Sequence, residues 1–314
     1  MTVTTWEVAG SRTLTLDSPV RRVHVRIENG AVNVVGTDEA VPEAPGSTRV
    51  EISGVEGAPL IVTRDGESLT VAYEDLPWTS LLGWLERKGR KGRLRSAVVS
   101  LAVPPGTDVE VAVVAAEAVV TGIRGCTTVH GVSGDTTLVG LDGEVRAGTV
   151  SGNVEAQAVT GALTYHSVSG SLTVVAGSGQ TVRADSVSGD MVLDLDPAGR
   201  PADISLTTVS GEVAIRLPHP TDAEVMANTA SGSVTNAFED LRVGGRWGAH
   251  TITGRLGAGA GTLRANTVSG AISLLRKPPS EDAPSEAPAP SEAPAPSDAP
   301  GPSGTPGPSL AKEL

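Results

Sequence analysis

Histidine and cysteine, the side chains that most often bind metals or act as nucleophiles, are scarce in this 314-residue chain. The five histidines are His24, His130, His166, His219 and His250. They form neither a His-x-x-x-His nor a His-Glu-x-x-His spacing, so the sequence predicts no metal site and no cofactor. The single cysteine, Cys126, excludes a disulfide framework and has no basic or histidine-rich sequence neighbours, so we expect a buried small side chain.

Acidic residues occur close to the repeated turns of the sequence and could form a carboxylate site. The candidates are Asp135, Glu144, Asp185, Asp190, Asp194 and Glu212. Paired carboxylates are the groups that cleave glycosidic bonds. The solvated outer faces of strands would carry the same residues, and outward carboxylates also discourage strand edges from aggregating. A carbohydrate-active β-helix enzyme is therefore the least favoured hypothesis, and we expect no catalytic residues and no enzyme.

Between Trp78 and Arg95 the sequence departs from strand-like alternation. Apolar residues at i, i+3, i+4 and i+7 predict one face of a short helix, and six basic residues follow. The candidate membrane or partner contacts are Trp78, Leu81, Leu82, Trp84, Leu85, Arg87, Lys88, Arg90, Lys91, Arg93 and Arg95. Apolar area combined with basic residues fits an anchor to an anionic membrane or an acidic partner.

Two other interpretations of this segment stay open. The helix could pack across the end of the fold and be followed by a solvated basic loop. The basic run could also bind nucleic acid, although it lacks the flanking aromatic rings that stack on single-stranded bases.

An internal repeat predicts the elements that position these residues. The tripeptide Val-Ser-Gly occurs six times, and from Val150 through Val159 to Val168 related tripeptides recur every nine residues. On both sides of each tripeptide apolar residues alternate with period two, which is typical of a strand with one buried face. A nine-residue unit holds one strand and one corner, so the chain is expected to wind into a β-solenoid. A conventional β-sandwich is the alternative.

The apolar alternation shifts by one residue at each tripeptide. A straight strand would then send its second half to solvent, so the shift predicts a corner where two neighbours, such as Thr149 and Val150, both point inward. The glycine that follows permits a tight turn or a close approach of backbones. The predicted corner residues are Val132, Gly134, Val150, Gly152, Val159, Gly161, Val168, Gly170, Val187, Gly189, Val209, Gly211, Val268 and Gly270.

The sequence divides into four segments. They are a β-rich N-terminal cap or start of the solenoid (1–76), an inserted amphipathic helix with a basic loop (77–96), the β-solenoid repeat (97–276) and a disordered Pro/Ala/Ser/Glu tail (277–314). At roughly 20 residues per coil, the repeat region would form about nine coils. In the cap, the Asn29-Gly30 pair predicts a hairpin turn. The tail holds eleven of the 22 prolines and little that could be buried.

Composition limits the function classes. Seven aromatic residues in the whole chain suit coils too narrow for rings. The net charge of −12 argues against nucleic acid as a partner, because affinity for it comes mainly from neutralising phosphates. No signal peptide or transmembrane segment is recognisable, since the longest apolar run is six residues against the roughly 20 that span a bilayer. We therefore expect a cytoplasmic protein, peripheral to the inner membrane face if residues 78–95 bind lipid.

Several stretches resemble a known family. They are Leu14-x-Leu16, Val23-x-Val25, Gly30-x-Val32-x-Val34, Leu101-x-Val103-Pro-Pro-Gly106 and the series of Val-Ser-Gly-x-Val units. Over about residues 5–276 the sequence is similar to the bacterial putative-adhesin β-strand-repeat domain family. The resemblance implies a β-strand-repeat fold of unknown biochemical activity, and it supplies no catalytic residues.

The sequence thus predicts an all-β protein, a single-stranded right-handed β-helix-like solenoid with an N-terminal β cap, one short inserted helix and a disordered tail. The predicted function is that of a non-enzymatic, adhesin-like interaction module whose partner is a protein or an anionic membrane surface. The alternative is a self-assembling cytoskeletal-type scaffold that polymerises end to end, as bactofilin-like solenoids do, so homo-oligomerisation stays open.

Overall fold

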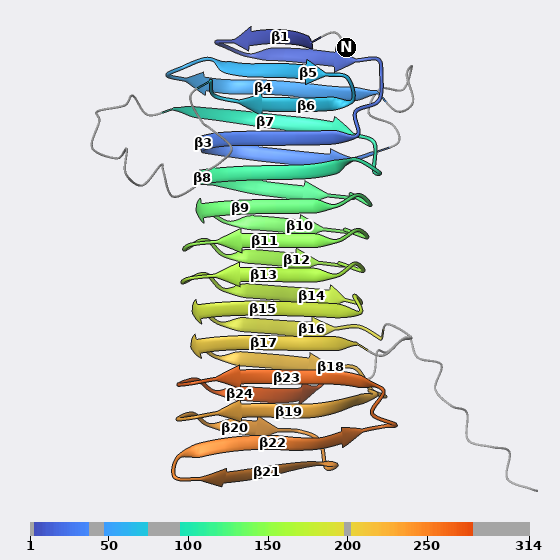
Figure 1. Ribbon diagram of the computed structural model, residues 1–314, viewed down its shortest axis with the longest axis vertical. Helices are drawn as coiled ribbons and strands as arrows, with labels where there is room; N and C mark the ends of the chain where they lie inside the picture. The colour runs from blue at the N-terminus through green and yellow to red at the C-terminus, as the bar shows by residue number, and fades with distance from the viewer. Residues whose placement is uncertain (1–2, 38–46, 75–94, 198–201, 279–314) are drawn as a thin grey trace, which may run out of the picture. The chain divides into compact units, whose positions relative to one another are not determined.

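A computed structural model describes residues 3–37, 47–74, 95–197 and 202–278 (Figure 1). Within these ranges all regular secondary structure is β, in 24 strands. The described residues fall within one unit, Met1–Pro278, and a second unit begins at Pro279. The helix predicted around Trp78–Leu85 lies outside the described residues, as does the predicted tail from Pro279 onward.

The strands follow one another along the chain with short connections. The first six are β1 (Val3–Val8), β2 (Arg12–Leu16), β3 (Arg22–Gly36), β4 (Thr48–Glu56), β5 (Leu60–Asp65) and β6 (Ser68–Ala72). The next twelve are β7 (Ser96–Val103), β8 (Asp108–Thr121), β9 (Thr127–Ser133), β10 (Thr136–Val139), β11 (Val145–Thr149), β12 (Val154–Gln157), β13 (Leu163–Ser167), β14 (Leu172–Gly177), β15 (Thr181–Ser188), β16 (Met191–Leu195), β17 (Asp203–Ser210) and β18 (Val213–Leu217). The last six are β19 (Ala223–Thr229), β20 (Val234–Asn236), β21 (Leu241–Arg246), β22 (Ala249–Leu256), β23 (Gly261–Thr267) and β24 (Ile272–Arg276).

Successive strands from β9 to β18 alternate between two faces of a flattened coil (Figure 1). On one face β11 pairs in parallel with β9 and β13, and on the other β12 pairs in parallel with β10 and β14. The long strand β8 belongs to both faces, because its first half pairs with β9 and its second half with β10. Each strand therefore bonds to the strands one coil before and after it, and the predicted β-solenoid is confirmed.

The register gives the length of a coil. Thr136 of β10 lies beside Val154 of β12, and Val154 lies beside Leu172 of β14, an advance of 18 residues each time. This is two of the nine-residue units in the sequence, one strand and one corner on each face. The described strands after β7 form eight coils, close to the nine expected, because the hairpin β21–β22 takes up part of the chain.

The core is a stack of small and branched side chains that point inward from both faces. In one coil these are Val145, Ala147, Val154 and Ala156, all of which are buried. One coil also encloses an aromatic ring: Tyr165 is fully buried, and its hydroxyl donates a hydrogen bond to the Gly170 carbonyl oxygen at 2.9 Å. Burial raises the pKa of Tyr165.

The expectation that both residues at the phase shift point inward was wrong. Thr149 is buried, whereas Val150 and Ser151 pass around the outside of the corner and the next buried residue is Gly152. The inner space of the corner is already taken by the Thr149 hydroxyl, which accepts a hydrogen bond from the Gly152 N–H at 2.9 Å. The shift in phase is real, but it arises from two outward residues.

The hairpin predicted at Asn29-Gly30 was also wrong, because β3 continues through both residues. The strand turns there from one face of the coil to the other, and its second half pairs in parallel with β7 and β8. Gly30 is required for two reasons: its φ is +110°, and a Cβ would lie 2.0 Å from the Ala97 carbonyl oxygen. An Asn-Gly pair therefore marks a corner here.

Antiparallel strands cover both ends of the parallel stack. At the N-terminal end β1, β5 and β6 extend one face, and β2, β4 and β7 extend the other. At the C-terminal end, β19 and β20 do not pair with the preceding strands β17 and β18 but leave a space of one coil beside them. The chain then forms the hairpin β21–β22 against β19 and turns back into that space. The returning strands β23 and β24 lie between β17–β18 and β19–β20 (Figure 1).

Candidate interaction surface

The Val-Ser-Gly tripeptides form the corner where a coil passes from the face of β11 to the face of β12, here called the first corner. A Cβ on Gly152, Gly170 or Gly270 would lie 1.9–2.0 Å from a backbone carbonyl oxygen of the neighbouring coil. Of the predicted corner glycines, Gly134 alone has a positive φ, +107°. Close contact between coils, rather than a left-handed backbone, is therefore the main reason for glycine at this position.

Hydroxyl groups on both sides of each glycine hold the first corner in place. On the inside, the Gly170 N–H donates a hydrogen bond to the Ser167 hydroxyl at 2.7 Å. On the outside, the Ser151 and Ser169 hydroxyls each donate to the valine carbonyl of the previous coil, both at 3.1 Å. The backbone beside each valine is thus fixed by bonds both within and between coils.

The valines of the first corner form a continuous apolar row, here called the valine ridge. It consists of Val150, Val168, Val187, Val209 and Val268, which lie at or just beyond the ends of β11, β13, β15, β17 and β23. Each of these side chains is 45–52% exposed, and they lie on five adjacent coils about 4.8 Å apart. At the two ends of the row Val132 is half-buried and Ala230 is exposed.

The other predicted corner pair lies elsewhere. Val159 and Gly161 belong to the second corner, where the chain returns from the face of β12 to the face of β13, and Val159 is buried there. A Cβ on Gly161 would lie 1.8 Å from the Gly143 carbonyl oxygen, so close contact between coils again requires glycine. The nine-residue repeat in the sequence therefore describes two different corners.

Two of the candidate acidic residues, Asp135 and Asp190, have a structural role in one column beside the first corner. An Asp135 carboxylate oxygen accepts a hydrogen bond from the Asn153 N–H at 3.1 Å, and Asp190 accepts one from the Glu212 N–H at 2.8 Å. Asn153 accepts in the same way from the Ser171 N–H. Each of these side chains accepts a hydrogen bond from a backbone N–H of the next coil. The position therefore requires a hydrogen-bond acceptor, and a negative charge is not needed.

Three of the other acidic candidates are paired with bases at separate places. Glu144 lies 2.6 Å from Arg146, and Asp185 lies 3.5 Å from His166. Asp194 is bonded to Arg216 and Lys277. Within the described ranges no group of three or more His, Cys, Asp or Glu residues is placed to hold a metal ion. The six acidic candidates are thus spread over several columns of the solenoid and do not line one groove.

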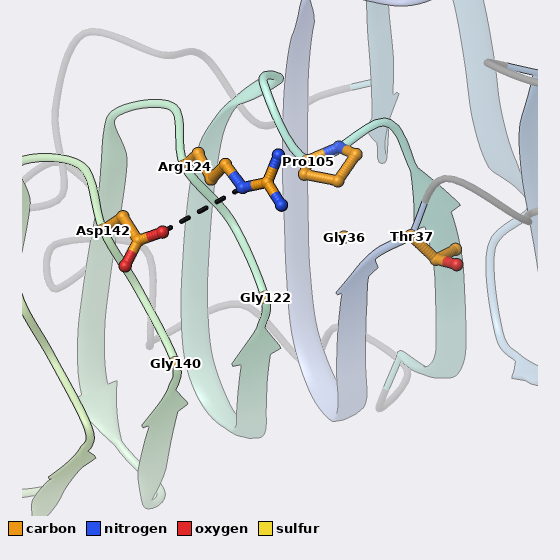
Figure 2. Close-up of a pocket in the computed structure, with 7 residues that line it drawn as sticks. All are labelled: Gly36, Thr37, Pro105, Gly122, Arg124, Gly140 and Asp142. Atoms are coloured by element: carbon orange, nitrogen blue, oxygen red, sulfur yellow. Dashed lines mark ion pairs between the residues drawn. The ribbon is translucent and has the colours of Figure 1, made fainter.

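The second corner carries an open polar hollow of about 440 Å³ (Figure 2). It is lined by Gly36, Gly122 and Gly140 and by Arg124 and Asp142, which form an ion pair of 4.0 Å. Asp142 also accepts a hydrogen bond from the Thr160 hydroxyl at 2.7 Å. The side chains of this ion pair are mostly exposed and already joined to each other, so the hollow is a shallow notch between coils.

The same corner repeats a left-handed backbone on four successive coils. The residues are Gly122, Gly140, Ala158 and Ala176, with φ of +69°, +61°, +50° and +53°. A Cβ at Gly140 would meet no atom within 4 Å, so alanine fits in the space available. The cost of alanine is instead conformational, since L-residues are disfavoured in this region.

A smaller hollow of about 190 Å³ brings together residues that are far apart in sequence. His24 Nδ1 lies 3.1 Å from a Glu110 carboxylate oxygen, because β3 and β8 are paired with these residues side by side. Cys126 lines the same hollow and is half-buried, and its Sγ lies 3.8 Å from Arg146. The sequence could not place His24 beside Glu110 without the register of β3 on β8.

Of the eleven predicted membrane or partner contacts, Arg95 lies within the described ranges. Its guanidinium lies 3.7 Å from Glu28 and 5.3 Å from the centre of the Tyr73 ring. Its carbonyl oxygen accepts a hydrogen bond from the Asn29 side chain at 2.8 Å. Arg95 therefore joins β3 to the start of β7, and the other ten predicted contacts lie outside the described residues.

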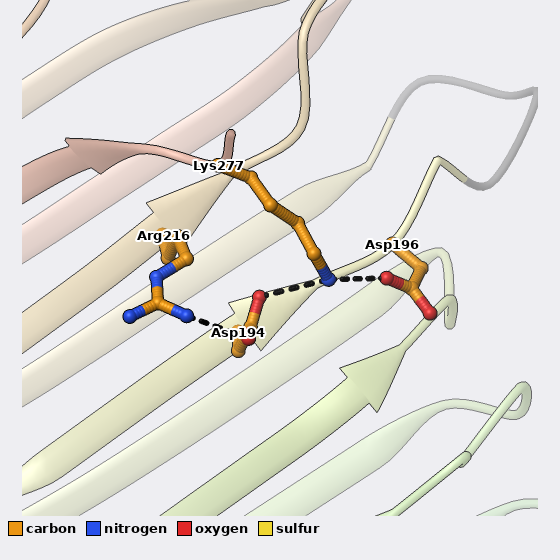
Figure 3. Close-up of polar contacts among 4 residues, drawn as sticks. All are labelled: Asp194, Asp196, Arg216 and Lys277. Atoms are coloured by element: carbon orange, nitrogen blue, oxygen red, sulfur yellow. Dashed lines mark hydrogen bonds and ion pairs between the residues drawn. The ribbon is translucent and has the colours of Figure 1, made fainter. Parts of the chain in front are cut away.

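A cluster of charged side chains lies at the end of β24, the last strand in the chain (Figure 3). The Lys277 ammonium lies 3.0 Å from Asp194 and 2.5 Å from Asp196, and Asp194 also bonds to Arg216 at 3.2 Å. The hydrogen bond to Asp196 is the main cause that raises the pKa of Lys277. These residues fix the point at which the chain leaves β24.

Comparison with known proteins identifies the family. The model of the Toastrack DUF4097 family matches residues 49–275. The chain belongs to the Toastrack family. This confirms the resemblance predicted from the repeated Ser-Gly-x-Val units. No curated protein matches this Toastrack sequence. Within the described ranges no helix is long and apolar enough to span a membrane.

Two solved structures are similar to this Toastrack chain. One is a "putative cell adhesion protein" from Clostridium sporogenes, with 12% identity and a TM-score of 0.27, covering 85% of this chain and 100% of that one. The other is a "putative adhesin" from Bacteroides fragilis, with 10% identity and a TM-score of 0.39, covering 87% of this chain and 97% of that one.

Proposed function

We propose that this Toastrack protein is a non-enzymatic, adhesin-like interaction module that binds a protein partner along the valine ridge. The observation that carries the proposal is a half-exposed valine at the same position on five adjacent coils. Exposed apolar side chains scattered singly are ordinary, but a contiguous row of them on a rigid surface is typical of an interaction site. The hydrogen bonds of the first corner supply the rigidity.

The spacing of the ridge favours a helical partner. Successive valines are about 4.8 Å apart, and an α-helix rises about 5.4 Å per turn. Side chains on the same side of an extended strand recur only about every 6.8 Å. A partner helix that lies along the ridge can therefore present one apolar side chain per turn to successive valines.

The test is photo-crosslinking in cells with a reactive amino acid in place of Thr207, which is exposed on β17 beside the ridge. The matched control carries the same amino acid at Glu155, which is exposed on β12 of the other face. We expect a defined adduct from the Thr207 site that disappears when Val168, Val187 and Val209 are all replaced by Thr. Equal adducts from both sites, or an adduct that survives the triple substitution, would contradict the proposal.

The second proposed contact is with an anionic membrane through residues 78–95, which would place the protein at the inner face of a membrane. Its support is the sequence: two tryptophans and a dense run of basic residues. A basic residue close to an anionic surface contributes roughly 1 kcal/mol. Arg95 is a weaker candidate for lipid contact than the other basic residues, because its side chain already pairs with Glu28 and stacks on Tyr73. The five basic residues before it are the better candidates.

Co-sedimentation with vesicles tests the membrane contact. The protein is expected to bind vesicles of phosphatidylglycerol and phosphatidylcholine, but not vesicles of phosphatidylcholine alone. Replacement of Trp78 and Trp84 by Ala, with Arg87, Lys88, Arg90, Lys91 and Arg93 replaced by Gln, should abolish this binding. The control Arg95→Gln should retain most of it. Unchanged binding by the multiple variant, or no binding by the native protein, would refute the contact.

A further inference from the structure

Four strands at the C-terminal end of the solenoid form a basic sheet. They lie side by side in the order β23, β19, β22 and β21. Their sequences contain four arginines and one acidic residue, Glu224, in a chain whose net charge is −12. Glu224 lies beside Arg255 in the register of β19 on β22. Positive charge is therefore concentrated in this sheet.

The register brings the other three arginines to the outer side of the sheet. Arg264, Met226, Thr253 and Arg242 lie next to one another across the four strands. Arg246 is four residues from Arg242 on β21 and therefore points to the same side. Arg242, Arg246, Arg264 and Met226 are all exposed and are here called the hairpin face.

The three arginines of the hairpin face are not neutralised by acidic neighbours. Among the residues that the structure describes, none of them has an ion-pair partner. By contrast, Arg146, further along the same side of the solenoid, lies 2.6 Å from Glu144. The hairpin face can therefore bind an anionic partner without first breaking an ion pair within the chain.

Exposed apolar side chains accompany these charges. Met226 is 50% exposed between Arg264 and Thr253, and Trp247 is 99% exposed at the turn between β21 and β22. Trp247 and Gly248 have φ of +55° and +87°, as in the hairpin turn that favours Asn-Gly. A bulky residue is uncommon at such a φ, and this one is not buried. The fold therefore gives no reason for tryptophan at this position.

We propose that the hairpin face and Trp247 bind the surface of an anionic membrane. The planar guanidinium group of arginine pairs with lipid phosphates. Tryptophan favours the boundary of a bilayer, where its ring meets apolar chains and its N–H meets water. The exposed Met226 adds apolar area that a purely ionic partner would not need. Unpaired arginines beside a fully exposed ring are the observation that carries the proposal.

This surface would act together with residues 78–95, so the inference rests on the membrane contact proposed for that segment. Stable attachment takes two signals, because one weak contact gives only marginal binding. The turn between β21 and β22 lies on the same edge of the solenoid as the end of β6 and the start of β7, which flank that segment in sequence (Figure 1). Ten strand-to-strand steps of about 4.8 Å lead from β6 to β22, so the two contacts would be about 48 Å apart.

Co-sedimentation of the full chain with vesicles of phosphatidylglycerol and phosphatidylcholine tests the arginines. Arg242→Gln, Arg246→Gln and Arg264→Gln in one chain should weaken binding at least tenfold, because each basic residue near an anionic surface strengthens binding roughly fivefold. The matched control has the same change in net charge and should alter the affinity less than twofold. It replaces by Gln three arginines that already pair with carboxylates: Arg124, Arg146 and Arg216. Equal weakening by both triple variants would overturn the proposal.

Trp247→Asn separates membrane binding from the stability of the turn. Asn-Gly is the favoured pair here, so the variant should be at least as stable as the native chain in urea. A tryptophan that served only the fold would leave vesicle binding unchanged, whereas a tryptophan at the bilayer boundary predicts a severalfold loss. Equal affinity of the native chain and Trp247→Asn would overturn the proposal and assign Trp247 to a protein partner.

A reporter at position 247 distinguishes this contact from that of residues 78–95. The amino acid 5-hydroxytryptophan in place of Trp247 is excited apart from the other tryptophans, and vesicles of brominated phosphatidylglycerol should quench it. The same reporter at Trp6, half-buried on β1, should not be quenched. Vesicle binding without quenching at position 247 would overturn the hairpin contact alone. Quenching there that persists in the multiple variant of residues 78–93 would overturn the contact of residues 78–95 alone, and a native chain that does not bind vesicles would overturn both.

Discussion

Replacement of Gly170 by Ala should destabilise the solenoid far more than replacement of Gly140 by Ala. Both residues are corner glycines: Gly170 lies at the first corner and Gly140 at the second. At Gly170 a Cβ would lie 2.0 Å from the Gly152 carbonyl oxygen of the neighbouring coil. At Gly140 a Cβ would meet no atom within 4 Å, and only its φ of +61° disfavours alanine.

The magnitude at Gly170 follows from what must move. The added carbon needs about one ångström more space than the coil spacing leaves, and the obstacle is a backbone atom. Overpacking of this kind costs about 1–3 kcal/mol. Displacement of the corner also weakens the Ser169 N–H bond to Val150, now 2.8 Å, and the Gly170 N–H bond to Ser167. Hydrogen bonds contribute about 0.5–1.5 kcal/mol each, so we expect a total loss of about 2–6 kcal/mol.

At Gly140 the expected loss is about 1 kcal/mol. A left-handed backbone costs an L-residue about 1–2 kcal/mol, and part of this is offset because alanine lowers the entropy of the unfolded chain. The difference between the two variants is thus expected to be about 1–5 kcal/mol, above the error of a denaturation experiment.

Urea denaturation followed by far-ultraviolet circular dichroism measures both variants. Because a stack of coils can lose cooperativity, amide hydrogen exchange in β12–β14 should accompany it. The loss in Gly170→Ala should be centred on the corner of that coil and its two neighbours. Equal midpoints for Gly140→Ala and Gly170→Ala would show that contact between coils is not the reason for glycine at the first corner.

Three further predictions test other features of the fold. Ala158→Gly should raise stability by about 0.5–1 kcal/mol, seen as a higher urea midpoint at unchanged m, because the φ of Ala158 is +50°; a lower midpoint would contradict backbone strain there. The chain has two tyrosines, and burial raises the pKa of Tyr73 to about 12 and that of Tyr165 in the same direction, so phenolate absorbance should stay low near pH 10–11 until the protein unfolds. Because the unfolded chain releases the Tyr73 proton near pH 10 and the folded chain does so near pH 12, stability should fall across that window, and early ionisation in the folded state would refute the assignment. Val187→Thr on the half-exposed ridge should cost less than about 1 kcal/mol, whereas Val213→Thr in the buried core should cost about 1–3 kcal/mol, and a reversed order in urea would contradict the orientation of the corner.

The solenoid could be predicted from the sequence because its signal is local. A strand with one buried face needs alternation, and a corner needs a shift in that alternation, so Val145–Ala156 already shows two strands and the corner between them. What alternation could not tell is the direction of the shift. Two inward residues and two outward residues give the same change of phase, and only the contact of the Thr149 hydroxyl with the Gly152 N–H decides between them.

Other features depend on pairings between distant parts of the chain. The Asn29-Gly30 pair predicts a hairpin locally, and it forms a corner because β7 and β8 lie beside the second half of β3. The insertion of β23–β24 between earlier coils has no local signal, since Val268 occurs in the same repeat as Val209 whichever coil it follows.

At the first corner, equivalent residues of successive coils form columns: one of glycines, one of side chains that accept a backbone hydrogen bond, and one of half-exposed valines. The fold restricts the residue type in these columns to different degrees, and this difference supports the valine ridge as an interaction surface. The glycine column is uniform because a carbonyl oxygen of the next coil leaves no space for a Cβ. The capping column needs only an acceptor, and it varies accordingly among Asp135, Asn153 and Ser171. The half-exposed valine needs only to tolerate an extended backbone, which any β-branched residue does. Its column should therefore vary like the capping column, yet it is valine on five adjacent coils, and a partner that contacts the exposed half would account for that uniformity.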